Sequence, residues 1–154
     1  MKNFCLLSII LFTLFSCQNE IKFNNSSVQG LKDNNFWRAL KSSAVINTDG
    51  SLIIEGIASD GKLSLNITGT TLKTYLLATD DSAKAVFTTS EGVVFSTGLN
   101  KGNGQIVITE YDIVNNTVSG TFKFNVIGQS NSSSPVLNIN FREGVFNKIT
   151  ISGH

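Results

Sequence analysis

The stretch Thr117-Val118-Ser119-Gly120-Thr121-Phe122-Lys123-Phe124-Asn125-Val126 decides the fold class of this chain. Its apolar residues and its glycine occupy every second position, and polar residues occupy the positions between them. Because successive side chains of a β-strand point to opposite faces, this alternation predicts a strand with one buried face and one solvated face.

The same pattern recurs on both sides of this stretch. Lys62–Thr68 and Leu137–Phe141 alternate in the same way, while Ser51–Ser59 is more apolar and is expected to be a central strand. No segment after the apolar leader keeps the 3.6-residue period of an amphipathic helix. Asp60-Gly61 is expected to form a two-residue hairpin turn, and Glu143-Gly144 to close the last hairpin. We therefore expect one all-β domain of about nine to ten strands, either an antiparallel β-sandwich or an up-and-down barrel.

The beginning of the chain resembles a bacterial lipoprotein export signal. The basic Lys2 precedes an apolar run, Phe4–Phe15, which would make a helix of about 18 Å, too short for a hydrocarbon core of about 30 Å. The run ends in Leu14-Phe15-Ser16-Cys17, which resembles a lipobox. A thiolate is the nucleophile that accepts a diacylglyceryl group, and the small Ser16 gives the peptidase access. We expect residues 1–16 to be a signal peptide and Cys17 to be the lipidation site.

The residues after the cysteine indicate where the anchored protein resides. Residues 17–35 are polar and are interpreted as a tether, with the domain proper at 36–154. Two or three acyl chains on Cys17 would hold the chain lastingly at a membrane of the cell envelope. Gln18 is not the aspartate associated with inner-membrane retention, which favours the outer membrane.

Composition excludes several function classes. The formal charge of +1 falls to zero when Lys2 leaves with the signal, so no long-range attraction to nucleic acid is expected. The two cysteines, Cys5 and Cys17, both precede the domain, which therefore has no internal disulfide. The single histidine is His154, the last residue, so neither a Ser-His-Asp device nor a zinc site can be assembled. We expect no enzyme, metal or cofactor.

A few carboxylates remain as candidates for chemistry. Glu110 and Asp112 are two residues apart on one expected strand, about 7 Å apart on one face, where they could perform acid–base work or hold Ca²⁺. The favoured alternative is that the strand emerges into water there, beyond the buried Ile106 and Ile108. Asp80-Asp81 and Asp49 with Asn47 could also hold calcium, but a role in stabilising turns is the favoured interpretation for them.

Three aromatic residues with polar groups are candidates for ligand binding. Trp37, Tyr75 and Tyr111 could stack on sugar rings if they were exposed together. Packing in the core or at its rim is the favoured alternative, because aromatic residues in β domains bury large areas.

Five segments of the chain carry a resemblance to a known family. They are Phe36-Trp37-Arg38-Ala39, Thr74-Tyr75-Leu76-Leu77, Gly104-Gln105-Ile106-Val107-Ile108-Thr109, Thr117-Val118-Ser119-Gly120-Thr121-Phe122-Lys123-Phe124 and Glu143-Gly144-Val145-Phe146. In their order and spacing, nearly the whole exported part of the chain resembles a family of small Bacteroidota lipoproteins classed as a domain of unknown function. The resemblance implies an all-β fold and an envelope location, and it implies no activity.

These observations lead to three hypotheses for function. The leading one is a lipid-anchored, non-enzymatic binding module whose partner is an envelope protein or a glycan. The second is a calycin-like barrel that carries an apolar small molecule in a Phe- and Ile-rich interior. The third is a hydrolase that uses Glu110 and Asp112.

Overall fold

The computed structural model describes residues 25–127 and 138–152, and these residues form strands and turns with no helix. The all-β class expected from the alternating pattern is thereby confirmed. The strands are β1 (Ser27–Lys32), β2 (Asn35–Arg38), β3 (Lys41–Ile46), β4 (Leu52–Ala58), β5 (Gly61–Ile67), β6 (Thr74–Leu76), β7 (Ala83–Thr89), β8 (Val94–Ser96), β9 (Asn103–Asp112), β10 (Thr117–Ile127) and β11 (Asn138–Ser152).

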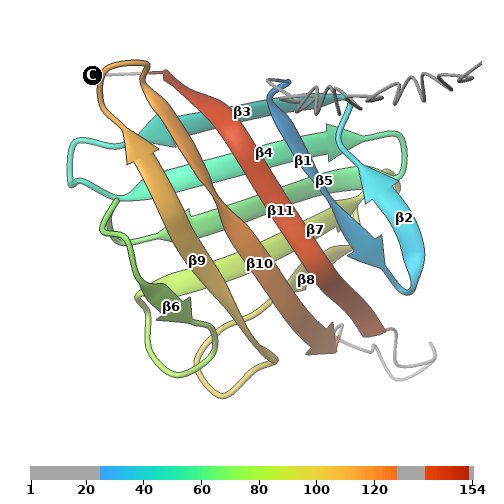
Figure 1. Ribbon diagram of the computed structural model, residues 1–154. Helices are drawn as coiled ribbons and strands as arrows, with labels where there is room; N and C mark the ends of the chain where they lie inside the picture. Colours follow the sequence, from blue (N-terminus) through green and yellow to red (C-terminus); the bar gives the residue numbers. More distant parts are fainter. Residues whose placement is uncertain (1–24, 128–137, 153–154) are drawn as a thin grey trace, which may run out of the picture.

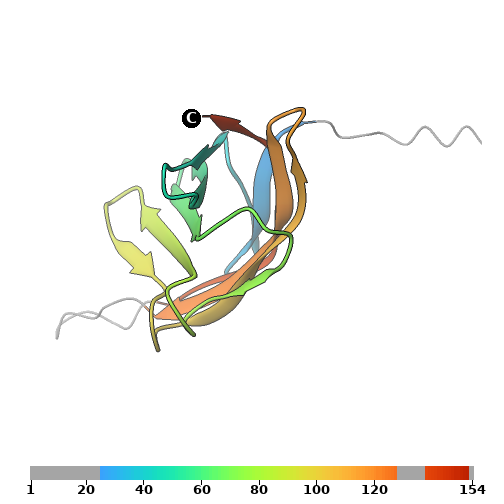
Figure 2. The same cartoon turned by 90° about the vertical axis from the view of Figure 1, so that its left-hand side faces the viewer.

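The strands form two layers that cross each other (Figure 1). One layer contains β6, β9, β10, β11, β1 and β2, and the other contains β3, β4, β5, β7 and β8. The layers belong to a single sheet with the order β6-β9-β10-β11-β3-β4-β5-β7-β8, and β1 and β2 extend from β11. Seen from the side, this sheet curls over on itself (Figure 2). Within the described residues its two ends, β6 and β8, do not pair, so the sheet is a curled half-barrel that stays open.

The strand β11 connects the two layers. It pairs with β10 and β1 along most of its length, and its last residues pair with β3, where Ile151 lies beside Ala44. This β3–β11 pair is parallel, whereas the other strand pairs are antiparallel.

Two bulges redirect β11 along the way. The register with β10 shifts between Phe122 and Phe124, where Glu143 has a φ of 50°. A bulge of this kind bends a strand and increases its twist. Glu143-Gly144, which we expected to close a hairpin, therefore lies inside β11, and that expectation is wrong. A β-carbon on Gly144 would lie 2.5 Å from the carbonyl oxygen of Phe122, so the bulge needs glycine there.

The alternation read from the sequence matches the burial of the strands. Val118, Gly120, Phe122, Phe124 and Val126 of β10 are buried, and the residues between them are more exposed apart from Ser119. The core is aromatic at its centre, and neighbouring ring centroids there lie 4.9 to 6.4 Å apart. The rings belong to Trp37, Phe87, Phe122, Phe124 and Phe141.

Other expectations for the central strands are confirmed with small changes. β4 lies between β3 and β5, as expected for the apolar stretch Ser51–Ser59. The expected two-residue turn is present, but its central residues are Ser59 and Asp60, and Gly61 is the first residue of β5. Residue Leu137 of the expected last alternating strand lies outside the described residues.

The folded domain begins earlier than expected. We interpreted residues 17–35 as a tether, yet Ser27–Lys32 forms β1, which pairs with both β11 and β2, and Val28 is buried. The interpretation is wrong for this part because the polar character of the segment belongs to only one of its faces. This strand and the three-residue strands β6 and β8 raise the number of described strands to eleven, above our expectation.

Candidate functional site

Two of the three aromatic candidates are core residues. Trp37 is 4% exposed and contacts the ring of Phe141 edge-on, with the centroids 5.4 Å apart. Tyr75 is equally buried, and its hydroxyl donates a hydrogen bond to the carbonyl oxygen of Thr71. Tyr111 is partly buried and packs against the core. The three side chains do not form a shared exposed platform, and core packing, the favoured alternative, describes Trp37 and Tyr75.

The indole of Trp37 belongs to a polar network at the edge of the core. Its Nε1 donates a 2.8 Å hydrogen bond to Asp60 Oδ1, and Lys32 Nζ lies 2.8 Å from Asp60 Oδ2. The same ammonium group lies 5.0 Å from the ring centroid of Phe87. Partial burial raises the pKa of Asp60, but the hydrogen bonds from Lys32 and Trp37 outweigh it and hold the pKa below its ordinary value. These contacts join β1 and β2 of one layer to the β4–β5 turn of the other, so the network links the two layers.

A bulge in β9 separates the carboxylate pair, Glu110 and Asp112, from the buried isoleucines of the same strand. Ser119 pairs with Glu110, and the next residue of β10, Gly120, pairs with Ile108. The extra residue on β9 moves Glu110 away from the buried face occupied by Ile106 and Ile108. Ser119 Oγ donates to Glu110 Oε2 and accepts a bond from the backbone N–H of Lys148.

Asp112 is used in the turn between β9 and β10. Its carboxylate accepts hydrogen bonds from the backbone N–H groups of Val114 and Asn115 and from the Asn115 side-chain amide. The bonds from Asn115 lower the pKa of Asp112. Each carboxylate therefore has hydrogen-bond partners nearby. The hollow that Asp112 lines does not include Glu110, so the two carboxylates do not face a shared cleft.

The remaining carboxylate candidates are also turn residues. Asp49 accepts hydrogen bonds from the hydroxyl and the backbone N–H of Ser51, which lower the pKa of Asp49. Asp80 accepts a hydrogen bond from the backbone N–H of Ser82. In the part of the chain that the structure describes, no group of three or more His, Cys, Asp or Glu residues is arranged to hold a metal ion.

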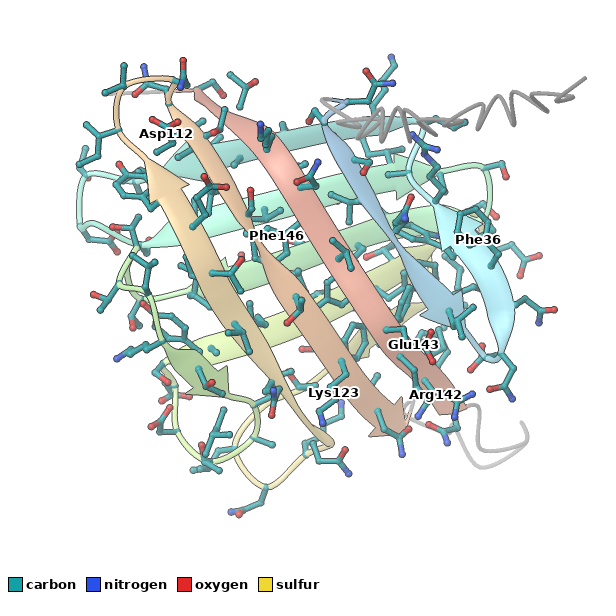
Figure 3. The ribbon with its side chains drawn as sticks, in the orientation of Figure 1. Phe36, Asp112, Lys123, Arg142, Glu143 and Phe146 are labelled. Atoms are coloured by element: carbon teal, nitrogen blue, oxygen red, sulfur yellow. The ribbon has the colours of Figure 1, made fainter. Side chains whose placement is uncertain are left out.

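The outer face of β2, β1 and β11 carries a groove of about 450 Å³. At this groove β1 lies between β2 and β11, because Gln29 of β1 pairs with Arg38 on one side and with Val145 on the other. Phe36, which projects from β2, is 68% exposed at this groove (Figure 3). The full lining consists of Asn25, Ser27, Gln29, Phe36, Arg38, Val145 and Asn147.

The groove combines one exposed aromatic ring with amide, hydroxyl and guanidinium groups. Such a set can stack on an apolar ring face and donate and accept hydrogen bonds around it. Phe36 was not among the candidates predicted from the sequence, because those were aromatic residues with polar groups. The signal was nevertheless present, since adjacent strand residues point to opposite faces, and a buried Trp37 requires an outward Phe36.

Two further surface hollows lie outside this groove. One, of about 320 Å³, is lined chiefly by Asn66–Thr68 of the β5 end and by Asp80–Lys84 before and within β7. The other, of about 340 Å³, lies where Ser26 approaches the β9–β10 turn and is lined also by Asp112 and Lys148.

Several expected features lie outside the described residues. These are the expected signal peptide, residues 1–16, the expected lipidation site Cys17, and His154. None of the described residues forms a helix long and apolar enough to cross a membrane.

The fold and the groove together describe an all-β domain with an open surface site. The chain belongs to the family described as Domain of unknown function (DUF6252), whose model matches residues 24–150. This match begins just before β1, in agreement with the early start of the folded domain. No curated protein and no solved structure matches the chain.

Proposed function

We propose that this chain is a non-enzymatic binding module of the cell envelope, held at the outer membrane by lipid on Cys17, and that it binds a glycan in the groove of β2, β1 and β11. The envelope location rests on the lipobox-like Leu14–Cys17 and on the short apolar run before it. The binding function rests on the groove.

The observation that carries the proposal is the exposed ring of Phe36 beside hydrogen-bonding side chains. An aromatic ring that is 68% exposed leaves a large apolar face in water. A sugar ring presents an apolar face of C–H groups and a rim of hydroxyls. Phe36 would stack on the former, while Gln29 and Arg38 would bond to the latter.

The packing of the interior favours this surface site over an interior carrier site. Aromatic rings fill the space between the layers, and Phe124 and Phe141 stack with their centroids 4.9 Å apart. A calycin-like carrier needs an apolar cavity of about 300 Å³ or more in that place. The described hollows of such size lie at the surface and include polar side chains.

The surroundings of the carboxylates also favour binding over hydrolysis. A glycosidase needs two carboxyl groups that face a shared substrate. Asp112 accepts three hydrogen bonds inside its own turn, and Glu110 accepts one from Ser119.

The binding function is tested with the full lipidated chain in detergent micelles on an array of neutral oligosaccharides. We expect selective binding, and we expect Phe36→Ala to weaken it at least about tenfold, as removal of a central aromatic contact does. Leu40→Ala is the matched control, because Leu40 is also highly exposed but does not line the groove. Binding that survives Phe36→Ala, or the absence of glycan binding, would contradict the proposal.

The anchor is tested separately by intact mass spectrometry of protein isolated from membranes of its native host. We expect a species that begins at Cys17 and carries acyl chains. A Cys17→Ser variant should lose the acyl mass and should leave the membrane fraction. A species that still begins at Met1, or one without acyl chains, would contradict the proposed location.

A further inference from the structure

The turn between β9 and β10 presents two large apolar side chains to solvent. Ile113 is 72% exposed and Val114 is 91% exposed. Turn positions are usually occupied by Gly, Pro, Asn, Asp or Ser, so two adjacent branched apolar residues at a turn are unusual. The other two turn residues, Asn115 and Asn116, are uncharged. The tip of this hairpin therefore contains no formal charge.

The hairpin holds these side chains outward in a fixed geometry. Asp112 accepts hydrogen bonds from the backbone N–H groups of Val114 and Asn115. The carbonyl oxygen of Asn116 accepts a 2.8 Å hydrogen bond from the N–H of Ile151 in β11. With both ends of the turn bonded, the backbone that carries Ile113 and Val114 is held in place.

The start of the folded domain lies beside this tip. Ser26 lines the same hollow of about 340 Å³ as Asp112, Asn115 and Thr117. The ribbon shows the start of β1 and the β9–β10 turn at one end of the front layer, and Asp112 is labelled there in the stick view (Figures 1 and 3). The chain thus leaves the domain, toward Cys17, at the end that carries the apolar tip.

The length of chain before this point limits how far the domain can move from its anchor. Ser26 follows Cys17 by nine residues (26 − 17 = 9), which span at most about 32 Å when fully extended. A bilayer that holds the acyl chains of Cys17 is therefore within reach of the end of the domain from which the chain emerges. The tether therefore keeps the hairpin tip at a high effective concentration near this bilayer.

We propose that Ile113 and Val114 insert into the interfacial region of the membrane that anchors the chain, as a second contact beside the lipid. The inference rests on the proposed lipidation of Cys17. The two apolar side chains would enter the boundary between headgroups and acyl chains, and Asn115 and Asn116 would remain among the headgroups. The absence of a formal charge at residues 113–116 keeps the desolvation cost of this contact low.

The test uses fluorophores attached to single cysteines on the full lipidated chain in vesicles of phosphatidylethanolamine and phosphatidylglycerol. The mature chain has no cysteine besides Cys17, whose thiol is blocked by the lipid, so an introduced cysteine is labelled alone. Val114→Cys receives an environment-sensitive fluorophore, and Ile113→Cys repeats the measurement. Leu99→Cys is the matched control, because Leu99 is also an apolar loop residue and is 61% exposed. Leu99 precedes β9 and Val114 follows it, so the two residues lie beyond opposite ends of this strand.

We expect blue-shifted emission and quenching by lipid-borne quenchers at positions 113 and 114, and neither effect at position 99. Flotation of the vesicles and intact mass measure the anchor independently. Protein that is acylated and floats, but whose labels at 113 and 114 remain in water, would overturn the insertion and leave the anchor intact. Equal quenching at position 99 would also overturn it, since the label rather than the tip would then be responsible. Protein without acyl chains would overturn both proposals.

Discussion

The side chain of Trp37, on β2, and that of Asp60, in the β4–β5 turn, are joined by a 2.8 Å hydrogen bond across the two layers of the sheet. Lys32 of β1 binds the second oxygen of the same carboxylate. One acidic side chain thus connects the first hairpin of the domain to the opposite layer, at a place where the sequence contains only a turn signal.

Removal of this carboxylate should destabilise the fold. Asp60→Ala leaves the buried indole N–H of Trp37 without its acceptor, which costs about 1–3 kcal/mol. We expect the lower half of this range, because the Asp60 side chain is 40% exposed and water can replace part of the interaction. Asp60→Asn keeps an acceptor and should cost less. Free energies of unfolding from urea titration measure both, and equal stabilities of Asp60→Ala and the wild type would contradict the role of the network.

The stability contributed by Asp60 should depend on pH in a defined direction. The hydrogen bonds from Lys32 and Trp37 outweigh burial and hold the pKa of Asp60 below its ordinary value of 3.8. A depressed pKa means that the stabilisation is fully present above the ordinary value and is lost as pH falls through the lower, folded-state value. The Tm difference between the wild type and Asp60→Asn, measured from neutral to strongly acidic pH, should therefore be largest near neutrality and should shrink below about pH 4. A Tm difference that stays constant over this pH range would argue against a lowered pKa of Asp60.

Gly120 should tolerate no side chain. A β-carbon there would lie 2.0 Å from the carbonyl oxygen of Val107 and 2.3 Å from the ring of Phe146. Gly120→Ala should therefore destabilise the protein by about 3 kcal/mol, since β10 is paired on both sides and cannot shift freely. Gly98→Ala is the control, because a β-carbon at Gly98 meets no atom within 4 Å. Thermal unfolding of both variants gives the comparison, and similar losses of Tm would contradict the packing described.

Truncation of the adjacent residues Phe36 and Trp37 should have very different effects on the stability of the fold. Phe36→Ala should change the free energy of unfolding by no more than about 0.5 kcal/mol, because the ring lies mostly in solvent. Trp37→Ala should cost about 3–5 kcal/mol, because it removes a buried ring from the aromatic centre of the core. Denaturant titrations of the two variants test this contrast, and a large loss for Phe36→Ala would place its ring in the core instead of at the groove.

The sequence was sufficient to predict the fold class and the buried faces. The alternation in β10 and β5 names the buried residues correctly, because side-chain direction in a strand is set by parity alone. The alternation no longer predicts side-chain direction beyond a bulge, because the bulge adds one residue to the strand. This is why Glu143-Gly144 was interpreted as a turn and why Glu110 was placed on the face of Ile108.

The groove was harder to predict from the sequence than the core. Its residues come from β1 and β2 and from β11, which begins about a hundred residues later in the chain and meets β1 only through pairings such as Val28 with Phe146. The polar composition around β1 hid a strand whose inward face consists of little more than Val28 and Gly30. Short edge strands of this kind receive most of their stability from their neighbours, so local sequence carries little signal of them.

The position of β11 in the sheet also determines when the protein can fold. Its residues, 138–152, pair with β1 from the start of the domain, with β10 and with β3, and the pair with β3 joins the two layers. The sheet therefore cannot be completed before residues 138–152 have been synthesised and can pair. Pairing between segments so far apart in the chain is intrinsically slow, so we expect closure of the sheet to be a late event in folding.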